Sequence, residues 1–368
     1  MVPEKGSTVK NAIQLAESSL LPDALIRIGI RRLLRHRIGE ITPANSEGAH
    51  HAKRAFLASM QESAVALYTD EANEQHYELP PAFFAHILGP RLKYSSCYYP
   101  SGRESLAEAE EAMLALYGER AELSDGIDIL ELGCGWGSLT LWMAEHYPHS
   151  RITALSNSHG QRQFIESRCR ELGFANVQVV TCDANQFETA GHFDRIVSVE
   201  MFEHLRNWRT MLKRVDRWMK PGGQAFFHVF CHRHYPYLFA VKDDNDWMSK
   251  HFFTGGLMPS ADLFHHFQEQ LVVADHWYLN GTHYARTAQH WLENMDRRRS
   301  DILSLLSQHY GEQEARIWFQ RWRMFFMSCE ELWGLDKGEQ WGVTHYLLRK
   351  RPTSVASPST NLDVDAQD

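Results

Sequence analysis

Long apolar runs, paired cysteines and an excess of basic charge are missing from this chain of 368 residues. No stretch approaches the roughly 18 uninterrupted apolar residues that a membrane-spanning helix requires. The formal net charge of -8 argues against a general nucleic-acid-binding protein, so we expect no nucleic-acid partner. The N-terminus also lacks an apolar signal segment followed by a cleavage site, and we therefore expect a cytoplasmic protein.

The six cysteines form no CxxC pair and no regular framework. In a chain of this length, that pattern predicts free thiols in a reducing compartment rather than a disulfide scaffold. The 21 histidines contain no HExxH motif and no Cys/His framework, so we predict no bound metal ion. Hydrophobic residues at 43% and charged residues at 23% indicate an ordinary globular protein with a sizeable core.

The two ends of the chain differ from its centre. Residues 1–70 are expected to form a helical extension, in which residues 24–34 mix apolar and basic side chains at helical spacing. The sequence favours a helix packed on the main domain over a cationic amphipathic helix on a membrane surface or an acidic partner. Residues 352–368 are rich in Ser, Pro, Thr and Asp and are predicted to be a disordered tail.

The centre of the chain alternates between apolar runs and segments with helical periodicity. Strands are predicted at 127–132, 151–155, 177–181, 193–199 and 224–230. Helices are predicted between them, at 137–147, 159–172 and 205–219. This alternation predicts a Rossmann-like α/β fold, with a parallel sheet and helices on both of its faces.

The predicted domains follow from this pattern. Residues 71–231 would form the cofactor-binding core with its N-terminal cap. Residues 232–330 are richer in aromatic residues and are expected to be a helical insertion that covers the carboxyl ends of the strands, where ligands bind in such sheets. Residues 331–351 would supply the final strands.

A glycine-rich turn follows the first predicted strand and precedes a helix. It contains Gly133, Cys134, Gly135 and Gly137, and the acidic Glu131 stands two residues before it. Glycines let the backbone turn tightly and approach a ligand, and the helix N-terminus adds partial positive charge. The spacing differs from the GxGxxG fingerprint of dinucleotide-binding proteins. It suits a cofactor with a cationic amino-acid tail better than one with a pyrophosphate.

Polar residues also follow the second and third predicted strands. Ser156 and Asn157 end the second strand, with Gln161 one helical turn later, where a dinucleotide-binding protein carries Asp or Glu. The third strand ends at Asp183, Ala184 and Asn185. Asp183 could accept a hydrogen bond from an adenine amino group, or it could cap a helix or form an Asx turn. All these strand ends would face one crevice, which predicts a cofactor site.

The fourth predicted strand leads into Glu200, Glu203 and His204. A histidine with an unperturbed pKa of about 6.5 suits a general base, and neighbouring carboxylates would raise that pKa. Carboxylates attract a cationic amine and a base removes its proton, so these residues are predicted to orient and deprotonate an amine. Alternatively, the glutamates could cap the following helix, or all three residues could bind a divalent ion.

Eight motifs between residues 75 and 350 carry a resemblance to a known family. They are QHYELP at 75–80, LKYSSCYY at 92–99, LELGCGWGSL at 130–139, EMFEH at 200–204, DW at 246–247, FFTGGLMPS at 252–260, NGTHYA at 280–285 and WRMFF at 322–326. The chain resembles the cyclopropane-fatty-acid-synthase superfamily of methyltransferases, most of all its coclaurine N-methyltransferase branch. The resemblance implies a class I methyltransferase fold with a mostly parallel seven-stranded sheet, and S-adenosyl-L-methionine as the cofactor.

The resemblance also implies roles for individual residues. Tyr94 and Ser95 would contact the methionine part of the cofactor, and Val199 would line the same cleft. The residues implied around the tail, ribose and adenine are Gly133, Asn157, Gln161, Asp183 and Ala184. In the N-methylating branch, the positions that match Glu200, Glu203 and His204 handle the amine.

Two departures count against lipid cyclopropanation. The lipid-modifying branches typically carry glycine in place of Glu200, and Tyr-Ser-Cys where this chain has Tyr94, Ser95 and Ser96. Cys329 falls where lipid-modifying relatives carry a cysteine once proposed as catalytic. It could equally be a buried neutral thiol.

We therefore expect an N-methyltransferase that acts on a small aromatic or benzylic amine. The alternative is C-methylation or cyclopropanation of an unsaturated fatty acyl chain, and only this alternative would require membrane contact. A third reading is a cofactor-binding protein that has lost catalysis. The aromatic residues of the insertion could hold either a flat amine or an acyl chain. The sequence leaves open whether the protein forms a homodimer.

Overall fold

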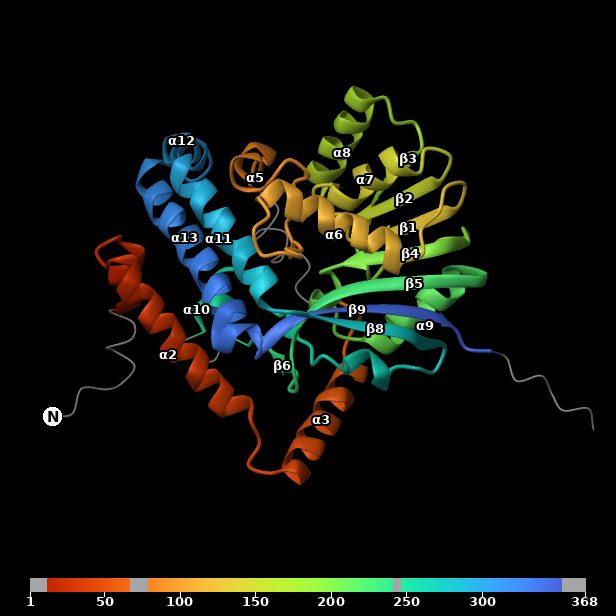
Figure 1. Ribbon diagram of the computed structural model, residues 1–368, viewed down its shortest axis with the longest axis horizontal. Helices are drawn as coiled ribbons and strands as arrows, with labels where there is room; N and C mark the ends of the chain where they lie inside the picture. Colours follow the sequence, from red (N-terminus) through yellow and green to blue (C-terminus); the bar gives the residue numbers. More distant parts are fainter. Residues whose placement is uncertain (1–11, 67–78, 241–245, 353–368) are drawn as a thin grey trace, which may run out of the picture.

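The computed structural model describes residues 12–66, 79–240 and 246–352. A seven-stranded sheet forms its centre, with the strand order β3-β2-β1-β4-β5-β9-β8 (Figure 1). The strands are β1 (Asp128–Leu132), β2 (Arg151–Ser156), β3 (Val177–Thr181), β4 (Phe193–Val199), β5 (Met219–His232), β8 (Leu271–Asn280) and β9 (Trp341–Lys350). Strands β1 to β5 pair in parallel, whereas β9 is antiparallel to both of its neighbours. The predicted Rossmann-like, mostly parallel sheet is confirmed.

Helices cover both faces of this sheet. The flanking helices are α6 (Leu106–Arg120), α7 (Ser138–His146), α8 (His159–Leu172) and α9 (Trp208–Trp218), whereas α5 (Pro81–Ile87) contacts α8. Strand β5 shows how the faces are buried. Phe226 and Phe230 belong to a core shared with α6 and α7, whereas Phe227 and Val229 belong to a second core shared with α9. Because side chains alternate along a strand, a strand buried on both faces must be almost continuously apolar.

A helical layer lies beside the carboxyl ends of the parallel strands (Figure 1). It consists of α10 (Trp247–His251), α11 (Thr282–Arg297), α12 (Arg299–Tyr310) and α13 (Glu312–Gly334), and a small sheet of β6 (Tyr237–Leu238) and β7 (Leu257–Met258) lies near it. None of the helices in the described parts of the chain is long and apolar enough to cross a membrane.

The region after β5 is divided differently from the prediction. Strand β8 lies inside residues 232–330, which were expected to be a helical insertion, and 331–351 contains only one strand, β9. Strand β8 is an edge strand with a register shift between Val273 and Asp275, and several of its side chains are exposed or half-buried. An edge strand of this kind has no continuous apolar run, so the sequence pattern does not reveal it.

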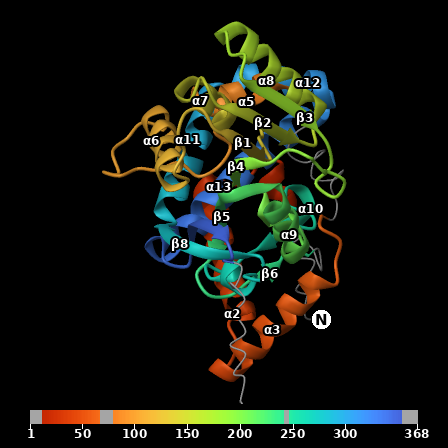
Figure 2. The same ribbon diagram turned by 90° about the vertical axis from the view of Figure 1, so that its right-hand side faces the viewer.

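The N-terminal region forms α2 (Asp23–Ile41) and α3 (Ser46–Gln61). Helix α2 lies along α13, where Arg27 donates hydrogen bonds to Glu330 (2.7 Å) and Glu331 (3.0 Å). Helix α3 contacts α9, and it lies at the opposite end of the molecule from α8 (Figure 2). The predicted disordered tail, from residue 353 onward, and residues 75–78 of the first motif lie outside the described residues.

Candidate active site

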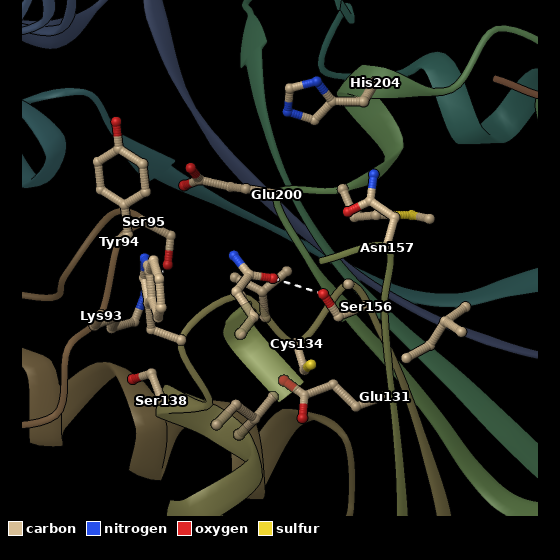
Figure 3. A pocket seen from close by; sticks show the side chains of 18 of the residues that line it. Lys93, Tyr94, Ser95, Glu131, Cys134, Ser138, Ser156, Asn157, Glu200 and His204 are labelled. Carbon is tan, nitrogen blue, oxygen red and sulfur yellow. Dashed lines mark hydrogen bonds between the residues drawn. The ribbon is translucent and has the colours of Figure 1, made fainter. Parts of the chain in front are cut away.

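A pocket opens at the carboxyl ends of β1, β2 and β4, as predicted for this type of sheet (Figure 3). The expected cofactor residues on its wall are Tyr94, Ser95, Glu131, Gly133, Cys134, Gly135, Ser156, Asn157, Gln161, Ala184 and Val199. Glu200 and His204 line the same pocket. The predicted site residues that do not line this pocket are Gly137, Asp183, Asn185, Glu203 and Cys329. The tertiary structure thus brings most of the predicted site together.

The glycine turn has the left-handed backbone that favours glycine. The φ angles of Gly133, Gly135 and Gly137 are 79°, 52° and 82°. A Cβ on Gly137 would lie 2.7 Å from Cγ1 of Ile165, so this glycine allows α7 and α8 to approach each other. A Cβ on Gly135 would meet no described atom within 4 Å, so a ligand can approach the backbone there.

Glu131 lies at the base of the pocket, where it is almost fully buried. Its Oε2 accepts a hydrogen bond of 2.5 Å from Thr140 at the start of α7. Burial raises the pKa of this carboxyl group to about 7. A cationic ligand would favour its ionised form, because opposite charges attract strongly in a partly dehydrated site.

Ser156, which Figure 3 labels, forms a polar pair with Gln161 on the pocket wall. Ser156 Oγ donates to Gln161 Oε1 at 2.6 Å and accepts from the backbone N–H of Ser158 at 3.0 Å. The buried Nε2 of Gln161 and Oγ of Ser138 have no hydrogen-bond partner in the described residues. Buried polar groups rarely stay unsatisfied, so this pocket suits a ligand with oxygen atoms such as ribose hydroxyls.

Asp183 and Asn185 stand behind the pocket wall. Oδ1 of Asp183 accepts from the backbone N–H of Asn185 at 2.6 Å, which is the Asx turn given as its alternative role. The side chain of Asn185 pairs with the backbone of Ala66, accepting at 2.9 Å and donating at 3.2 Å. Ala66 lines the pocket, whereas Asn185 does not, so these hydrogen bonds let Asn185 position the pocket wall through Ala66.

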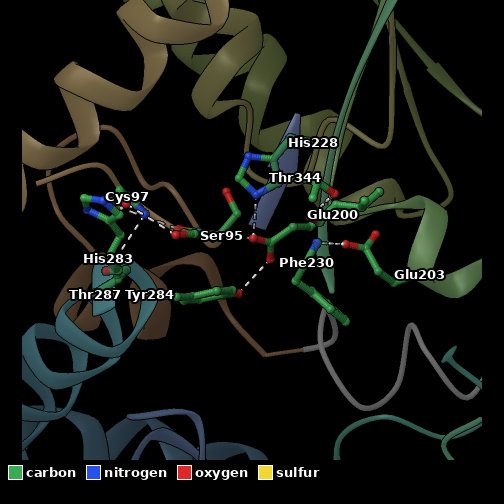
Figure 4. Close-up of polar contacts among 12 residues, drawn as sticks. Ser95, Cys97, Glu200, Glu203, His228, Phe230, His283, Tyr284, Thr287 and Thr344 are labelled. Atoms are coloured by element: carbon green, nitrogen blue, oxygen red, sulfur yellow. Dashed lines mark hydrogen bonds and ion pairs between the residues drawn. The ribbon is translucent and has the colours of Figure 1, made fainter. Parts of the chain in front are cut away.

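Glu200 is held at the pocket wall by three different elements (Figure 4). Its Oε1 accepts from the backbone N–H of Ser96 at 2.9 Å and lies 3.1 Å from Nε2 of His228. Its Oε2 accepts from the hydroxyl of Tyr284 at 2.7 Å. Burial raises the pKa of this carboxyl group, and the nearby cation of Lys93 opposes the rise. The carboxylate is therefore fixed in orientation before any substrate binds.

Glu203 and His204 occupy different environments. Glu203 is fully buried and its Oε1 accepts from the backbone N–H of Phe230 at 2.7 Å, so it holds β5 rather than capping a helix. His204 lines the pocket, and its ring lies 4.7 Å from that of Phe253. Burial lowers the pKa of His204 to about 4, because desolvation outweighs the attraction of Glu200. The expected rise of this pKa was wrong, and a neutral imidazole results.

Cys329 lies on α13, away from the pocket wall. Burial and the negative charge of Glu200 raise the pKa of its thiol far above the usual range. This is the neutral thiol that the sequence left open as an alternative. Among the described residues, no group of three or more His, Cys, Asp or Glu side chains is arranged to hold a metal ion.

Three residues around Glu200 that the sequence did not single out are Lys93, Tyr117 and His228, and a fourth, Tyr284, is one of the aromatic residues of the insertion. Lys93 is almost fully buried, and its Nζ donates to Oγ of Ser95 at 2.5 Å and to the carbonyl oxygen of Ser96 at 2.6 Å. Lys93 and Tyr284 belong to quoted motifs, and His228 is a polar residue inside a predicted apolar strand. A polar residue within a buried strand was the available signal.

Comparison with known proteins identifies the family. The family model of mycolic acid cyclopropane synthetase matches residues 67–337. (S)-Coclaurine N-methyltransferase from Thalictrum flavum subsp. glaucum is 34% identical over 358 residues, covering 95% of this chain and 98% of that enzyme. The cyclopropane-fatty-acyl-phospholipid synthase of Escherichia coli strain K12 is 32% identical over 225 residues, covering 60% of this chain and 55% of that enzyme.

Solved structures agree with this assignment. The crystal structure of coclaurine N-methyltransferase bound to N-methylheliamine and SAH matches with a TM-score of 0.90 and 34% identity, covering 93% of this chain and 100% of that chain. The cyclopropane synthase MmaA2 from Mycobacterium tuberculosis, at 21% identity and a TM-score of 0.65, shares the fold. The chain therefore belongs to the mycolic acid cyclopropane synthetase family and is an S-adenosylmethionine-dependent methyltransferase.

Proposed function

We propose that this methyltransferase transfers the methyl group of S-adenosylmethionine to the nitrogen atom of a small aromatic or benzylic amine. The carboxylate of Glu200, held at the pocket wall beside the neutral imidazole of His204, is the observation that carries the proposal. A fixed carboxylate attracts an ammonium ion, and a neutral imidazole can accept its proton. The likeness to coclaurine N-methyltransferase supports an amine acceptor.

The pocket residues suit the cofactor. Glu131 would pair with the ammonium group of its methionine tail, and the backbone at Gly133 and Gly135 would lie beside that tail. Ser156, Asn157 and Gln161 would hold the ribose hydroxyls, and Ala184 would lie near the adenine. Tyr94, Ser95 and Val199 would line the methionine end. The bound cofactor supplies a methyl group on a sulfonium, which is electrophilic and needs no further activation.

The acceptor amine must lose a proton before its nitrogen has a lone pair for attack. We assign this step to His204, because its lowered pKa keeps the imidazole neutral near pH 7, so that one ring nitrogen is unprotonated and can accept the proton. Glu200 would orient the ammonium ion and stabilise the positive charge that stays on the product. Phe253, which lies against His204, would contact the flat part of the substrate.

In this proposal Glu203 and Cys329 support the site without contacting the substrate. Glu203 holds the backbone of Phe230 and thereby the wall beside Glu200, so we propose that it is a positioning residue. Cys329 would contribute packing as a neutral thiol. We also propose that the enzyme acts in the cytoplasm, because all six cysteines are free thiols, as a reducing compartment would keep them.

Transfer of a labelled methyl group from S-adenosylmethionine to two pools tests the proposal. One pool contains aromatic and benzylic amines, and the other contains vesicles of unsaturated phospholipids. We expect label in an amine, and we expect Glu200→Gln to reduce that transfer while leaving the cofactor dissociation constant near that of the wild type. Label in the lipid alone would overturn the amine proposal in favour of acyl-chain methylation or cyclopropanation.

A further inference from the structure

A chain of hydrogen bonds leads from Glu200 through the core to the protein surface. Figure 4 marks the contact between His228 and Glu200, in which Nε2 lies 3.1 Å from Oε1. Nδ1 of His228 lies 3.0 Å from Nε2 of His345. Nδ1 of His345 lies 2.8 Å from a terminal nitrogen of Arg120. Two imidazole rings therefore connect the pocket carboxylate to a cation at the far end.

Local structure explains why these side chains meet. His228 on β5 and His345 on β9 are directly paired in the antiparallel ladder, so both side chains point to the same face of the sheet. Helix α6 covers that face and ends at Arg120. Tyr117, one turn earlier on the same side of the helix, places its hydroxyl 2.8 Å from Nδ1 of His228.

Both histidines are fully buried and neutral. Burial lowers the pKa of His228 and of His345 well below the usual range, and the cations of Lys93 and Arg120 lower both further. A neutral imidazole has one nitrogen that donates and one that accepts. The tautomer of each ring is therefore set by its neighbours.

Arg120 fixes the tautomer of His345 at the outer end of this hydrogen-bond chain. A guanidinium group only donates hydrogen bonds, so Nδ1 of His345 must accept and its Nε2 must carry the proton. Nε2 of His345 then donates to Nδ1 of His228, and the hydroxyl of Tyr117 donates to the same nitrogen, which leaves Nε2 of His228 as the donor to Glu200. The opposite tautomer of His228 would place a nitrogen lone pair against the carboxylate of Glu200.

The outer end of the chain is anchored at the surface. The guanidinium of Arg120 lies 4.9 Å from the ring centre of Trp277, in a shallow depression also lined by Glu119, Asp275 and Arg349. Arg120 is only half-buried, so its charge is accessible to solvent, and it cannot accept a proton from His345. This row of hydrogen bonds therefore cannot carry a proton from Glu200 to the protein surface.

We propose that Arg120 and His345 are positioning residues that hold His228 in the tautomer protonated at Nε2, and so keep Glu200 ionised and aimed at the acceptor amine. The inference rests on the proposed function of Glu200. Lys93 also lies close to this hydrogen-bond chain, with its Nζ 5.0 Å from the ring centre of Tyr117. Lys93 donates hydrogen bonds to Ser95 and Ser96 and forms none with either imidazole.

The tautomers can be measured without any methyl acceptor. Correlation NMR spectra of the protein labelled with 15N-histidine distinguish a ring protonated at Nε2 from one protonated at Nδ1, and His228→Gln and His345→Gln spectra assign the two rings. We expect both rings of the wild type to be protonated at Nε2. Arg120→Met should give His345 and His228 a mixture of tautomers, whereas Arg120→Lys, which keeps a cationic donor, should preserve the wild-type spectrum.

Arg349→Met is the matched control, since it removes a charge from the same depression without touching His345. We expect Arg120→Met to lower kcat/KM for the amine about tenfold, the loss expected for one hydrogen bond to a charged group, with cofactor affinity unchanged. The control should retain wild-type values.

A wild-type His228 protonated at Nδ1, or tautomers that do not respond to Arg120→Met, would overturn the inference. A wild type that methylates no amine would instead overturn the proposed function and leave the tautomer result standing.

Discussion

The hydroxyl of Tyr284 donates a hydrogen bond of 2.7 Å to Oε2 of Glu200, which joins helix α11 to the end of strand β4. The ring of Tyr284 stacks on Trp333 with centroids 4.7 Å apart, so the hydroxyl is held in place. The helical layer therefore contributes directly to the orientation of the pocket carboxylate. Its role extends beyond covering the strands.

Removing the hydroxyl of Tyr284 is expected to lower kcat/KM for the acceptor amine and to leave the affinity for the cofactor unchanged. Tyr284→Phe should lower kcat/KM for the amine by about tenfold or more, because a hydrogen bond to a charged group contributes roughly 1.5–3 kcal/mol. Steady-state kinetics and calorimetric titration with the cofactor measure the two effects separately. Tyr278→Phe, at an exposed ring on β8, is the control. An equal loss of cofactor affinity in Tyr284→Phe would contradict the assignment.

Cofactor affinity should depend on the charge of Glu131. Its pKa of about 7 means that the free enzyme is partly protonated there near neutral pH. A cationic cofactor tail favours the ionised form, so binding should release a proton and affinity should fall as the pH drops below about 7. Glu131→Gln should weaken binding about tenfold and abolish this proton release. Titration calorimetry in buffers of different ionisation enthalpy would test both, and unchanged proton release in the variant would refute the role.

Gly137 is expected to matter for folding more than for binding. Gly137→Ala combines a left-handed backbone with a Cβ only 2.7 Å from Ile165, so it should lower the free energy of unfolding by roughly 1–3 kcal/mol. Gly173→Ala also has a positive φ but meets no described atom within 4 Å, and it should cost about 1 kcal/mol. Urea denaturation would compare the two variants. Equal costs would show that the contact with Ile165 relaxes freely.

The stability of the protein should fall on acidification. The pKa values of His228 and His345 are lowered by burial, so the unfolded chain binds protons below about pH 6.5 that the folded chain excludes. Each such residue should lower the free energy of unfolding by about 1.4 kcal/mol per pH unit below that range. His345→Asn should make this slope shallower, whereas His159→Asn, at an exposed position, should not. Urea denaturation from neutral pH to about pH 5 measures the slopes, and identical slopes would contradict the buried neutral state.

The core of the fold follows from local sequence patterns. The apolar runs at 127–132 and 193–199 are long enough to be recognised as β1 and β4, and the glycine turn marks the change from strand to helix. Strand β8 escaped prediction, because an edge strand with exposed polar positions lacks the apolar pattern of an internal strand. The aromatic-rich composition of residues 232–330 indicated the helical layer. The contacts of this layer with Glu200 could not be deduced from residue spacing.

Which strand ends meet can be predicted from the sequence, since parallel strands place their carboxyl ends at one edge of a sheet. That rule brought Glu131, Asn157 and Glu200 to a common pocket. The surroundings of these three residues depend on tertiary packing. The pKa of His204 falls instead of rising, and Glu200 meets His228, because burial and side-chain contacts depend on residues distant in the chain. Desolvation and hydrogen-bond direction arise from three-dimensional packing, which residue spacing does not encode.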